Sequence, residues 1–219
     1  MNFKLLLLSL ILFVSCKSET KTELKDLTIA EKIANAHGFE KWKDVSSIKF
    51  TFNVDADSTH FERKWLWKPK TNEVTLFKDS INTITYKRAE VDSLTTQTDA
   101  GFINDKYWLL APFNMVWDKG TTVSEPIKEN APVSKKTLNK ITLTYTGKGG
   151  YTPGDAYDFY YNDDFIIQEW IFRKSNNPNP SMATTWEDYE DFNGLKIAKS
   201  HKKDDGNWNL NFTDIEVEF

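Results

Sequence analysis

Cysteine and histidine are scarce in this sequence, and their scarcity excludes several classes of site. The 219-residue chain has one cysteine, Cys16, and three histidines, His37, His60 and His201. A single cysteine excludes a disulfide within the chain and any zinc site built from several thiolates. The histidines stand at no metal-ligand spacing, and the sequence has no Gly-x-Ser-x-Gly nucleophile elbow. We therefore expect no metal, no cofactor and no enzymatic activity.

An excess of positive charge is also missing. Lys and Arg number 28 against 32 Asp and Glu, which gives a formal net charge of -4 at pH 7. Proteins that bind nucleic acid or the surface of an anionic membrane need clustered positive charge. We therefore expect neither kind of contact from the folded domain, and the acidic run at residues 187–191 is typical of a solvated strand edge.

Two patterns begin like ligand loops and then lack a required residue. Residues 55–59 start like a calcium loop, but His60 replaces the turn glycine and Leu66 replaces the final glutamate. Residues 147–150 are glycine-rich, yet no helix follows them, so a phosphate would meet no helix N-terminus. We interpret both as turns.

The N-terminus has the features of an export signal. Lys4 precedes residues 5–14, which are apolar except for Ser9. Ten helical residues reach about 15 Å, half of a bilayer core, which suits a signal peptide and is too short for a membrane span. Residues 13–16 then resemble the bacterial lipobox, in which the cysteine is acylated and becomes the first residue after cleavage. The alternative is an ordinary signal peptide that ends near a cysteine.

The expected organisation has three parts. Residues 1–15 are a cleaved signal peptide, residues 16–27 are the lipidated Cys16 and a polar tether, and residues 28–219 form a single domain. Two or more acyl chains hold a protein stably on a membrane. We therefore expect attachment by lipid to the bacterial cell envelope, at the outer membrane. We also expect the protein to be a monomer.

Two helices are expected in a β-rich domain. Thr28 and Glu31 form a capping box before an amphipathic stretch, and Gly38 is placed to end that helix in a left-handed conformation. His37 falls in its last turn, where a positive charge is favoured. Residues 103–110 have a second helical period, which Pro112 is expected to stop.

Alternating apolar residues predict the strands. They occur at 48–54, 61–67, 73–77, 81–87, 141–145, 157–161, 166–172, 186–192, 195–201 and 208–219. Arg63 falls on the apolar face of its strand and needs a partner, and Asn193-Gly194 is a strong hairpin signal. The fold class is mainly β: a curved antiparallel half-barrel of about ten or eleven strands in one long sheet, with one or two helices covering the concave face.

Several stretches together resemble one family. They are Ala36-His37-Gly38, Trp42, the helix at 103–110 with Pro112, the turn at 151–155, and Gly194-Leu195 before a late strand. These stretches are similar to the LolA/LolB-like superfamily, the lipoprotein-sorting carriers and their relatives in Bacteroidetes envelopes. The resemblance implies a half-barrel lidded by helices around an apolar cavity that takes acyl chains.

The expected function follows from the strand faces and from this resemblance. We predict that a lipid or acyl chain binds in an apolar cavity. The residues expected to line it are Phe50, Phe52, Trp65, Trp67, Trp108, Tyr145, Phe159 and Trp170. Two alternatives are open: a structural or partner-binding lipoprotein whose core is filled, and a surface lipoprotein that stacks carbohydrate on exposed Trp and Tyr.

Overall fold

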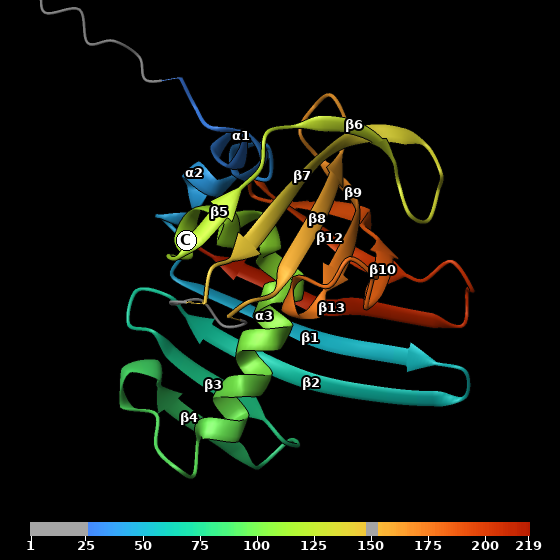
Figure 1. Ribbon diagram of the computed structural model, residues 1–219. Coiled ribbons are helices and arrows are strands. Elements are labelled where there is room, and N and C mark those ends of the chain that lie inside the picture. The colour runs from blue at the N-terminus through green and yellow to red at the C-terminus, as the bar shows by residue number, and fades with distance from the viewer. Residues whose placement is uncertain (1–25, 148–152) are drawn as a thin grey trace, which may run out of the picture.

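The computed structural model describes residues 26–147 and 153–219 (Figure 1). The expected signal peptide, Cys16 and most of the tether lie outside the described residues. Among the residues that are described, no helix is both long enough and apolar enough to span a membrane.

The described part of the chain is mainly β, as predicted, and contains three α-helices. The helices are α1 (Ile29–Ala36), α2 (Phe39–Trp42) and α3 (Thr96–Trp117), with short 3₁₀ turns at Arg88–Glu90 and Lys174–Asn176. The strands are β1 (Ser47–Ala56), β2 (Thr59–Lys68), β3 (Glu73–Phe77), β4 (Thr83–Lys87), β5 (Thr121–Val123), β6 (Ile127–Asn130), β7 (Thr137–Tyr145), β8 (Ala156–Tyr161), β9 (Ile167–Arg173), β10 (Met182–Thr185), β11 (Glu187–Phe192), β12 (Leu195–Lys202) and β13 (Trp208–Glu218).

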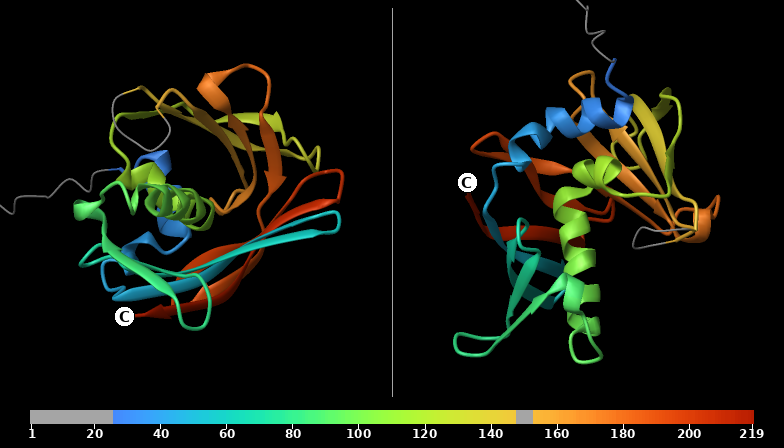
Figure 2. Two further views of the ribbon diagram at one scale, coloured as in Figure 1. Left: turned by 90° about the horizontal axis from the view of Figure 1, so that it is seen from below. Right: turned by 90° about the vertical axis from the view of Figure 1, so that its left-hand side faces the viewer.

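The strands form two antiparallel sheets, so the expectation of one long sheet was wrong. The seven-stranded sheet has the order β11-β12-β13-β1-β2-β3-β4. The six-stranded sheet has the order β10-β9-β8-β7-β5, with β6 also paired to β7. Figure 2 shows α3 lying between the two sheets. Three strands, β5, β6 and β10, were not expected, because each has only three or four residues.

The chain passes from one sheet to the other at Trp186, between β10 and β11. The Trp186 amide donates to the Gln168 carbonyl at 2.7 Å, and the Lys202 amide donates to Oγ1 of Thr185 at 2.9 Å. The two sheets therefore meet there without a regular backbone ladder. We call the contact of β9 and β10 with β11 and β12 the seam.

The first helix begins and ends as the sequence predicted. Thr28 and Glu31 form the capping box, and Gly38 follows the helix with a φ of 92°. A Cβ at Gly38 would lie 1.9 Å from the Gly194 carbonyl oxygen, so the helix end packs directly on the β11–β12 hairpin. In that hairpin Asn193 and Gly194 both have positive φ, as the predicted turn requires.

His37 does not carry the positive charge expected at the end of α1. Its side chain is buried, and Nδ1 lies 2.8 Å from the Ile33 carbonyl oxygen. Burial lowers the pKa of His37 to about 4, so the ring is neutral. The expectation was wrong because β11 and β12 cover this helix end.

Pro112 does not stop the second helix, which is longer than predicted. α3 continues to Trp117, and its backbone leaves helical geometry only at Leu110, with φ -128° and ψ 26°. Proline has no N–H for the carbonyl four residues earlier, so it kinks a helix that other contacts hold together. Here the kink directs the last turns of α3 onto Phe39 and Trp42.

A β-bulge explains a change of phase in the last strand. The apolar residues of β13 fall at even positions up to Phe212 and at odd positions from Ile215. Lys49 pairs with Glu216 and Thr51 with Thr213, so two residues of β13 face Phe50. Asp214 has a φ of 51° at this point. The bulge lets both halves of the strand bury the same face.

Candidate functional site

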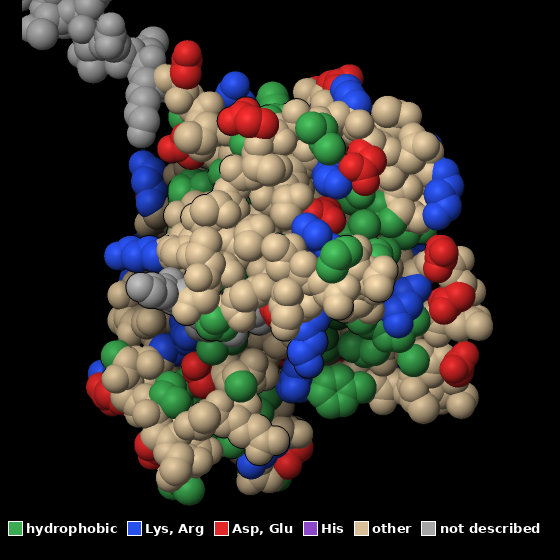
Figure 3. Space-filling view, viewed as in Figure 1, with side chains coloured by type: hydrophobic (Ala, Val, Ile, Leu, Met, Phe, Trp, Pro, Cys, Tyr) green, Lys and Arg blue, Asp and Glu red, His purple; other side chains and the backbone are tan. Residues whose placement is uncertain are grey.

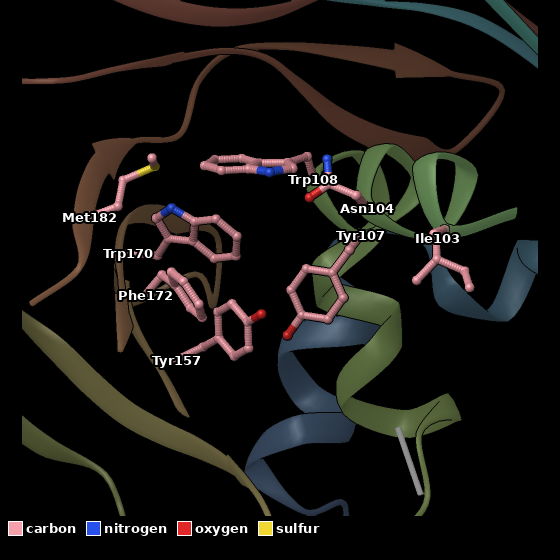
Figure 4. Close-up of a pocket in the computed structure, with 9 residues that line it drawn as sticks. Ile103, Asn104, Tyr107, Trp108, Tyr157, Trp170, Phe172 and Met182 are labelled. Atoms are coloured by element: carbon pink, nitrogen blue, oxygen red, sulfur yellow. The ribbon is translucent and has the colours of Figure 1, made fainter. Parts of the chain in front are cut away.

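A cavity of about 370 Å³ lies between α3 and the inner face of the six-stranded sheet. Figure 4 shows the aromatic rings that form its wall. Its lining is Ala100, Ile103, Asn104, Tyr107, Trp108, Tyr157, Trp170, Phe172 and Met182. No charged side chain is among these residues, so the cavity suits an apolar ligand.

Local structure places the lining on two surfaces. On α3, the lining positions 100, 103, 104, 107 and 108 repeat at helical spacing and share one face. On the sheet, Phe172 is the cross-strand neighbour of Tyr157 on one side and of Met182 on the other. Directly opposed residues share a face of the sheet, so these three side chains point toward α3.

The wall is made of rings in mutual contact. The ring centroids of Trp108 and Trp170 are 4.4 Å apart, in an edge-to-face arrangement. Tyr107 and Tyr157 are 4.8 Å apart, and Tyr157 and Trp170 are 5.3 Å apart. Contacts of this kind hold the rings in place. Figure 3 shows hydrophobic side chains gathered on the face that carries β10 and the ends of β1 and β2.

Polar groups at the cavity are few and uncharged. Asn104 is exposed at the rim, and its amide donates to Oδ1 of Asp105 at 3.0 Å. The hydroxyls of Tyr107 and Tyr145 lie 3.3 Å apart, and Tyr145 donates to Oδ2 of Asp118 at 2.6 Å. Burial raises the pKa of Tyr107 well above its usual value, so its hydroxyl stays protonated.

The eight residues predicted for the cavity are all buried, but they do not all line it. Trp108 and Trp170 line the cavity. The other six lie in the hydrophobic core and are absent from its lining: Phe50, Phe52, Trp65, Trp67, Tyr145 and Phe159. Whether any of the eight binds a ligand stays a prediction.

The lining residues that the prediction missed come from helix α3, from two predicted strands and from β10. Tyr107, Ile103 and Asn104 belong to α3, whose helical spacing was visible in the sequence. Tyr157 and Phe172 stand on the apolar faces of predicted strands and could have been included. Met182 belongs to β10, which is too short to leave a recognisable alternation.

The opposite side of α3 packs on the seven-stranded sheet through a buried carboxylate. Asp105 accepts hydrogen bonds from Nε of Arg63 at 2.7 Å, Nη2 of Arg63 at 2.5 Å and Nε1 of Trp65 at 2.8 Å. The expectation that Arg63 needs a partner is confirmed. Burial raises the pKa of Asp105, and the Arg63 guanidinium opposes that rise.

A buried lysine, Lys106, directly follows Asp105 on α3. Nζ of Lys106 donates to Oδ1 of Asn114 at 3.1 Å and lies 5.2 Å from the centre of the Trp117 ring. Burial lowers the pKa of Lys106 to about 8. Lys106 faces away from the cavity and is not among its lining residues.

Nothing in the described part of the chain offers a metal centre. Within residues 26–147 and 153–219 no three His, Cys, Asp or Glu side chains are grouped to hold an ion. The acidic run lies on β11, an edge strand, where Glu187 pairs with Lys202 and Glu190 with Lys199. This agrees with the interpretation of the run as a solvated edge.

The structure is similar to two solved structures at low sequence identity. One is a Vibrio parahaemolyticus protein described as a "putative outer membrane lipoprotein-sorting protein domain", with a TM-score of 0.46 and 10% identity over 86% of this chain and 93% of that one. The other is a DUF1329 family protein from Desulfovibrio piger, with a TM-score of 0.45 and 8% identity over 87% of this chain and 92% of that one. No family model and no curated protein matches the sequence.

Proposed function

We propose that this protein is an envelope lipoprotein, anchored through Cys16, that binds one hydrophobic chain between α3 and the six-stranded sheet. The observation that carries the proposal is the 370 Å³ cavity, whose lining is aromatic or aliphatic except for Asn104. Ligand sites in proteins span about 300–1,000 Å³ and are mostly apolar with a few polar groups. The cavity meets both conditions.

The volume of the cavity sets the size of the ligand. A cavity of about 150 Å³ holds one benzene, so 370 Å³ scales to a ligand of roughly fifteen carbon atoms. That is the size of one acyl chain. A lipoprotein with several acyl chains would exceed this space, so the proposal is limited to a single chain.

The energetics of burial are sufficient for specific binding. Each methylene removed from water contributes about 0.8 kcal/mol, so a chain of roughly fifteen carbons contributes about 12 kcal/mol, and the loss of translational and chain freedom on binding costs at least about 4 kcal/mol. Micromolar affinity corresponds to about 8 kcal/mol. We therefore expect micromolar binding of a chain that is largely enclosed.

The proposed anchor limits what the protein does with its ligand. An acylated Cys16 with two or more chains would keep the domain at one membrane. The domain would then receive or hold an acyl chain at that membrane, as a monomer, and would not carry it across the periplasm. The outer membrane remains the proposed location.

The test is titration of the domain with a fluorescent fatty acid, using a variant that narrows the cavity mouth. Ala100 is exposed at the rim, so Ala100→Trp adds a large side chain there without entering the core. Ala89→Trp is the matched control, because Ala89 is also exposed and lies outside the cavity lining. We expect saturable binding by the wild type, at least tenfold weaker binding by Ala100→Trp, and no change in Ala89→Trp.

Absence of binding by the wild type would contradict the proposal and favour the structural or partner-binding alternative. Circular dichroism spectra of the variants are compared with that of the wild type, so that a loss of affinity can be distinguished from a loss of folded structure. The carbohydrate alternative calls for exposed rings, whereas every Trp and Tyr in the described part of the chain is buried or half-buried.

A further inference from the structure

Four buried polar atoms at the seam have no hydrogen-bond partner. They are Nε1 of Trp170, Nε1 of Trp186, Oγ1 of Thr184 and Nε2 of His201. Each of these residues is at least 97% buried. Buried polar groups in proteins are nearly always paired, so several unpaired ones in one place indicate a partner that the chain itself does not supply.

The four side chains that carry these atoms form one cluster. The Trp186 ring centre lies 5.4 Å from that of Trp170 and 4.5 Å from that of His201. Thr184 is the cross-strand neighbour of Trp170. Trp108, on the cavity wall, contacts both Trp170 at 4.4 Å and His201 at 5.4 Å. Because Trp170 itself lines the cavity, the cluster adjoins the cavity wall.

The hydrogen-bonding character of the cluster is defined. The two indole nitrogens can only donate. Nδ1 of His201 lies 3.3 Å from the Thr185 carbonyl oxygen, so Nδ1 carries the proton and Nε2 is left as an acceptor. Burial lowers the pKa of His201 to about 3, which keeps the ring neutral. With two indole donors, a Thr184 hydroxyl that can also donate, and no charge, the cluster is suited to a carbonyl oxygen and not to a cation.

Met182 lies next to Trp170 on the cavity wall (Figure 4). Figure 4 shows the indole nitrogen of Trp170 on the edge of the ring that faces Met182. Met182 lines the cavity, is half-buried and lies on β10, a four-residue strand at the edge of its sheet. Methionine is unbranched and flexible, so rotation of its side chain can open a path to the Trp170 N–H.

We propose that the cluster receives the carbonyl group of the acyl ligand, which accepts hydrogen bonds from the indole N–H groups of Trp170 and Trp186. The chain then extends along the aromatic wall toward the exposed rim at Ala100 and Asn104. This inference rests on the proposed function, because it needs the cavity to bind a chain, and it adds the chemical class of the head group.

The experiment follows the indole N–H protons by ¹H–¹⁵N nuclear magnetic resonance. Their signals are assigned with Trp170→Phe and Trp186→Phe, and the protein is titrated with dodecanoic acid, methyl dodecanoate and decane. An indole proton moves downfield when it gains a hydrogen bond. We expect both signals to move with a carbonyl-bearing probe and to stay in place with decane. If the indole signals move with the acid and not with the ester, the cluster recognises a free fatty acid. If they move with both probes, the cluster recognises the carbonyl group that the acid and the ester share.

A second measurement separates head-group recognition from chain burial. Thr184→Val removes one hydroxyl and nearly keeps the side-chain shape, whereas His201→Phe keeps an aromatic ring and removes both ring nitrogens, including the Nδ1 bond to the Thr185 carbonyl. We expect dodecanoic acid to bind about tenfold more weakly to Trp186→Phe, with decane binding unchanged, since one hydrogen bond contributes about a factor of ten. Thr184→Val and His201→Phe should leave ester binding within threefold of wild type.

The outcomes distinguish the inference from the proposed function. If every probe binds but neither indole signal moves, the cluster holds buried water only, and the inference is overturned while the proposed function stands. If no probe displaces the fluorescent fatty acid and none binds directly, both are overturned.

Discussion

Replacing Asp105 by alanine should lower the free energy of unfolding by about 3 kcal/mol, because this carboxylate joins α3 to the seven-stranded sheet. Asp105 is fully buried and accepts two bonds from Arg63 and one from the Trp65 indole. Removing one partner of a buried ion pair costs roughly 3–5 kcal/mol. The Arg63 side chain is 30% exposed and keeps contact with water, so we take the lower end of that range.

A double-mutant cycle identifies the source of this loss. Arg63→Met removes the charge and keeps the stem against Phe52 and Phe61, whose rings lie 5.4 and 5.0 Å from the guanidinium carbon. We expect it to cost about 2 kcal/mol, and the double variant to lose at least 1 kcal/mol less than the sum of the single losses. Chemical denaturation measures each value. In thermal melts a loss of 3 kcal/mol should lower Tm by about 6–12 °C in a chain of this size.

The same pair gives a pH dependence with a defined sign. Burial raises the pKa of Asp105 above its ordinary value, and removal of Arg63 raises it further. A carboxyl group whose pKa is raised on folding contributes stability at low pH that is lost as the pH rises through the folded pKa. The penalty of Arg63→Met should therefore be larger at pH 7 than at pH 4. Equal penalties at both pH values, or additive losses in the cycle, would refute this account of how α3 is held.

Three further predictions follow from other sites. Burial lowers the pKa of His37 to about 4 and that of His201 to about 3, against 6.5 in the unfolded chain, so each ring contributes stability that is present above pH 6.5 and is lost as the pH falls. His201→Phe should therefore reduce the slope of unfolding free energy against pH by up to about 1.4 kcal/mol per pH unit, measured by denaturant titration between pH 6 and 4.5, and an unchanged slope would contradict a buried neutral ring. Gly38→Ala should lower the free energy of unfolding by several kcal/mol, because its Cβ would lie 1.9 Å from the Gly194 carbonyl oxygen. Gly206→Ala is the control: Gly206 also has a positive φ but has open space around it, so the substitution should cost only about 1–2 kcal/mol. Equal losses of stability in the two variants would contradict the packing of α1 on the hairpin. Cys16→Ser should release the protein from the membrane fraction and abolish palmitate labelling, and a variant that stays bound and labelled would exclude lipid attachment at this residue.

The sequence predicts the local structure well where the chemistry is local. The capping box at Thr28, the left-handed Gly38 and the Asn193-Gly194 turn depend on residues within a few positions of one another, and all three are confirmed. The change of phase after Phe212 was also visible in the printed sequence. That this change marks a β-bulge at Asp214 becomes clear only from the pairing of β13 with β1.

Features that depend on distant segments could not be predicted in the same way. Alternation shows which side of a strand is buried, but it does not show whether hydrogen bonding continues from one strand to the next, so the break between the sheets at Trp186 was missed. It also does not distinguish an inward ring that packs on α3 from one that borders a space. Phe50 and Trp65 pack into the core, while Trp170 borders the cavity.

The position of the cavity follows from how α3 fills the space between the sheets. Toward the seven-stranded sheet, α3 presents Phe102, whose ring makes edge contacts with Trp65 and Trp67. It also presents the Asp105 carboxylate, which accepts a hydrogen bond from Trp65, so side chains are in direct contact on that side. Toward the six-stranded sheet the ring contacts are concentrated at Trp108 and Tyr107, and the smaller Ala100 lies at the rim. A large side chain holds two surfaces apart, and a small one beside it leaves the space unfilled. If that space is the ligand site, its size is set at the rim, and substitution there should change affinity while the ion pair on the other side of α3 maintains stability.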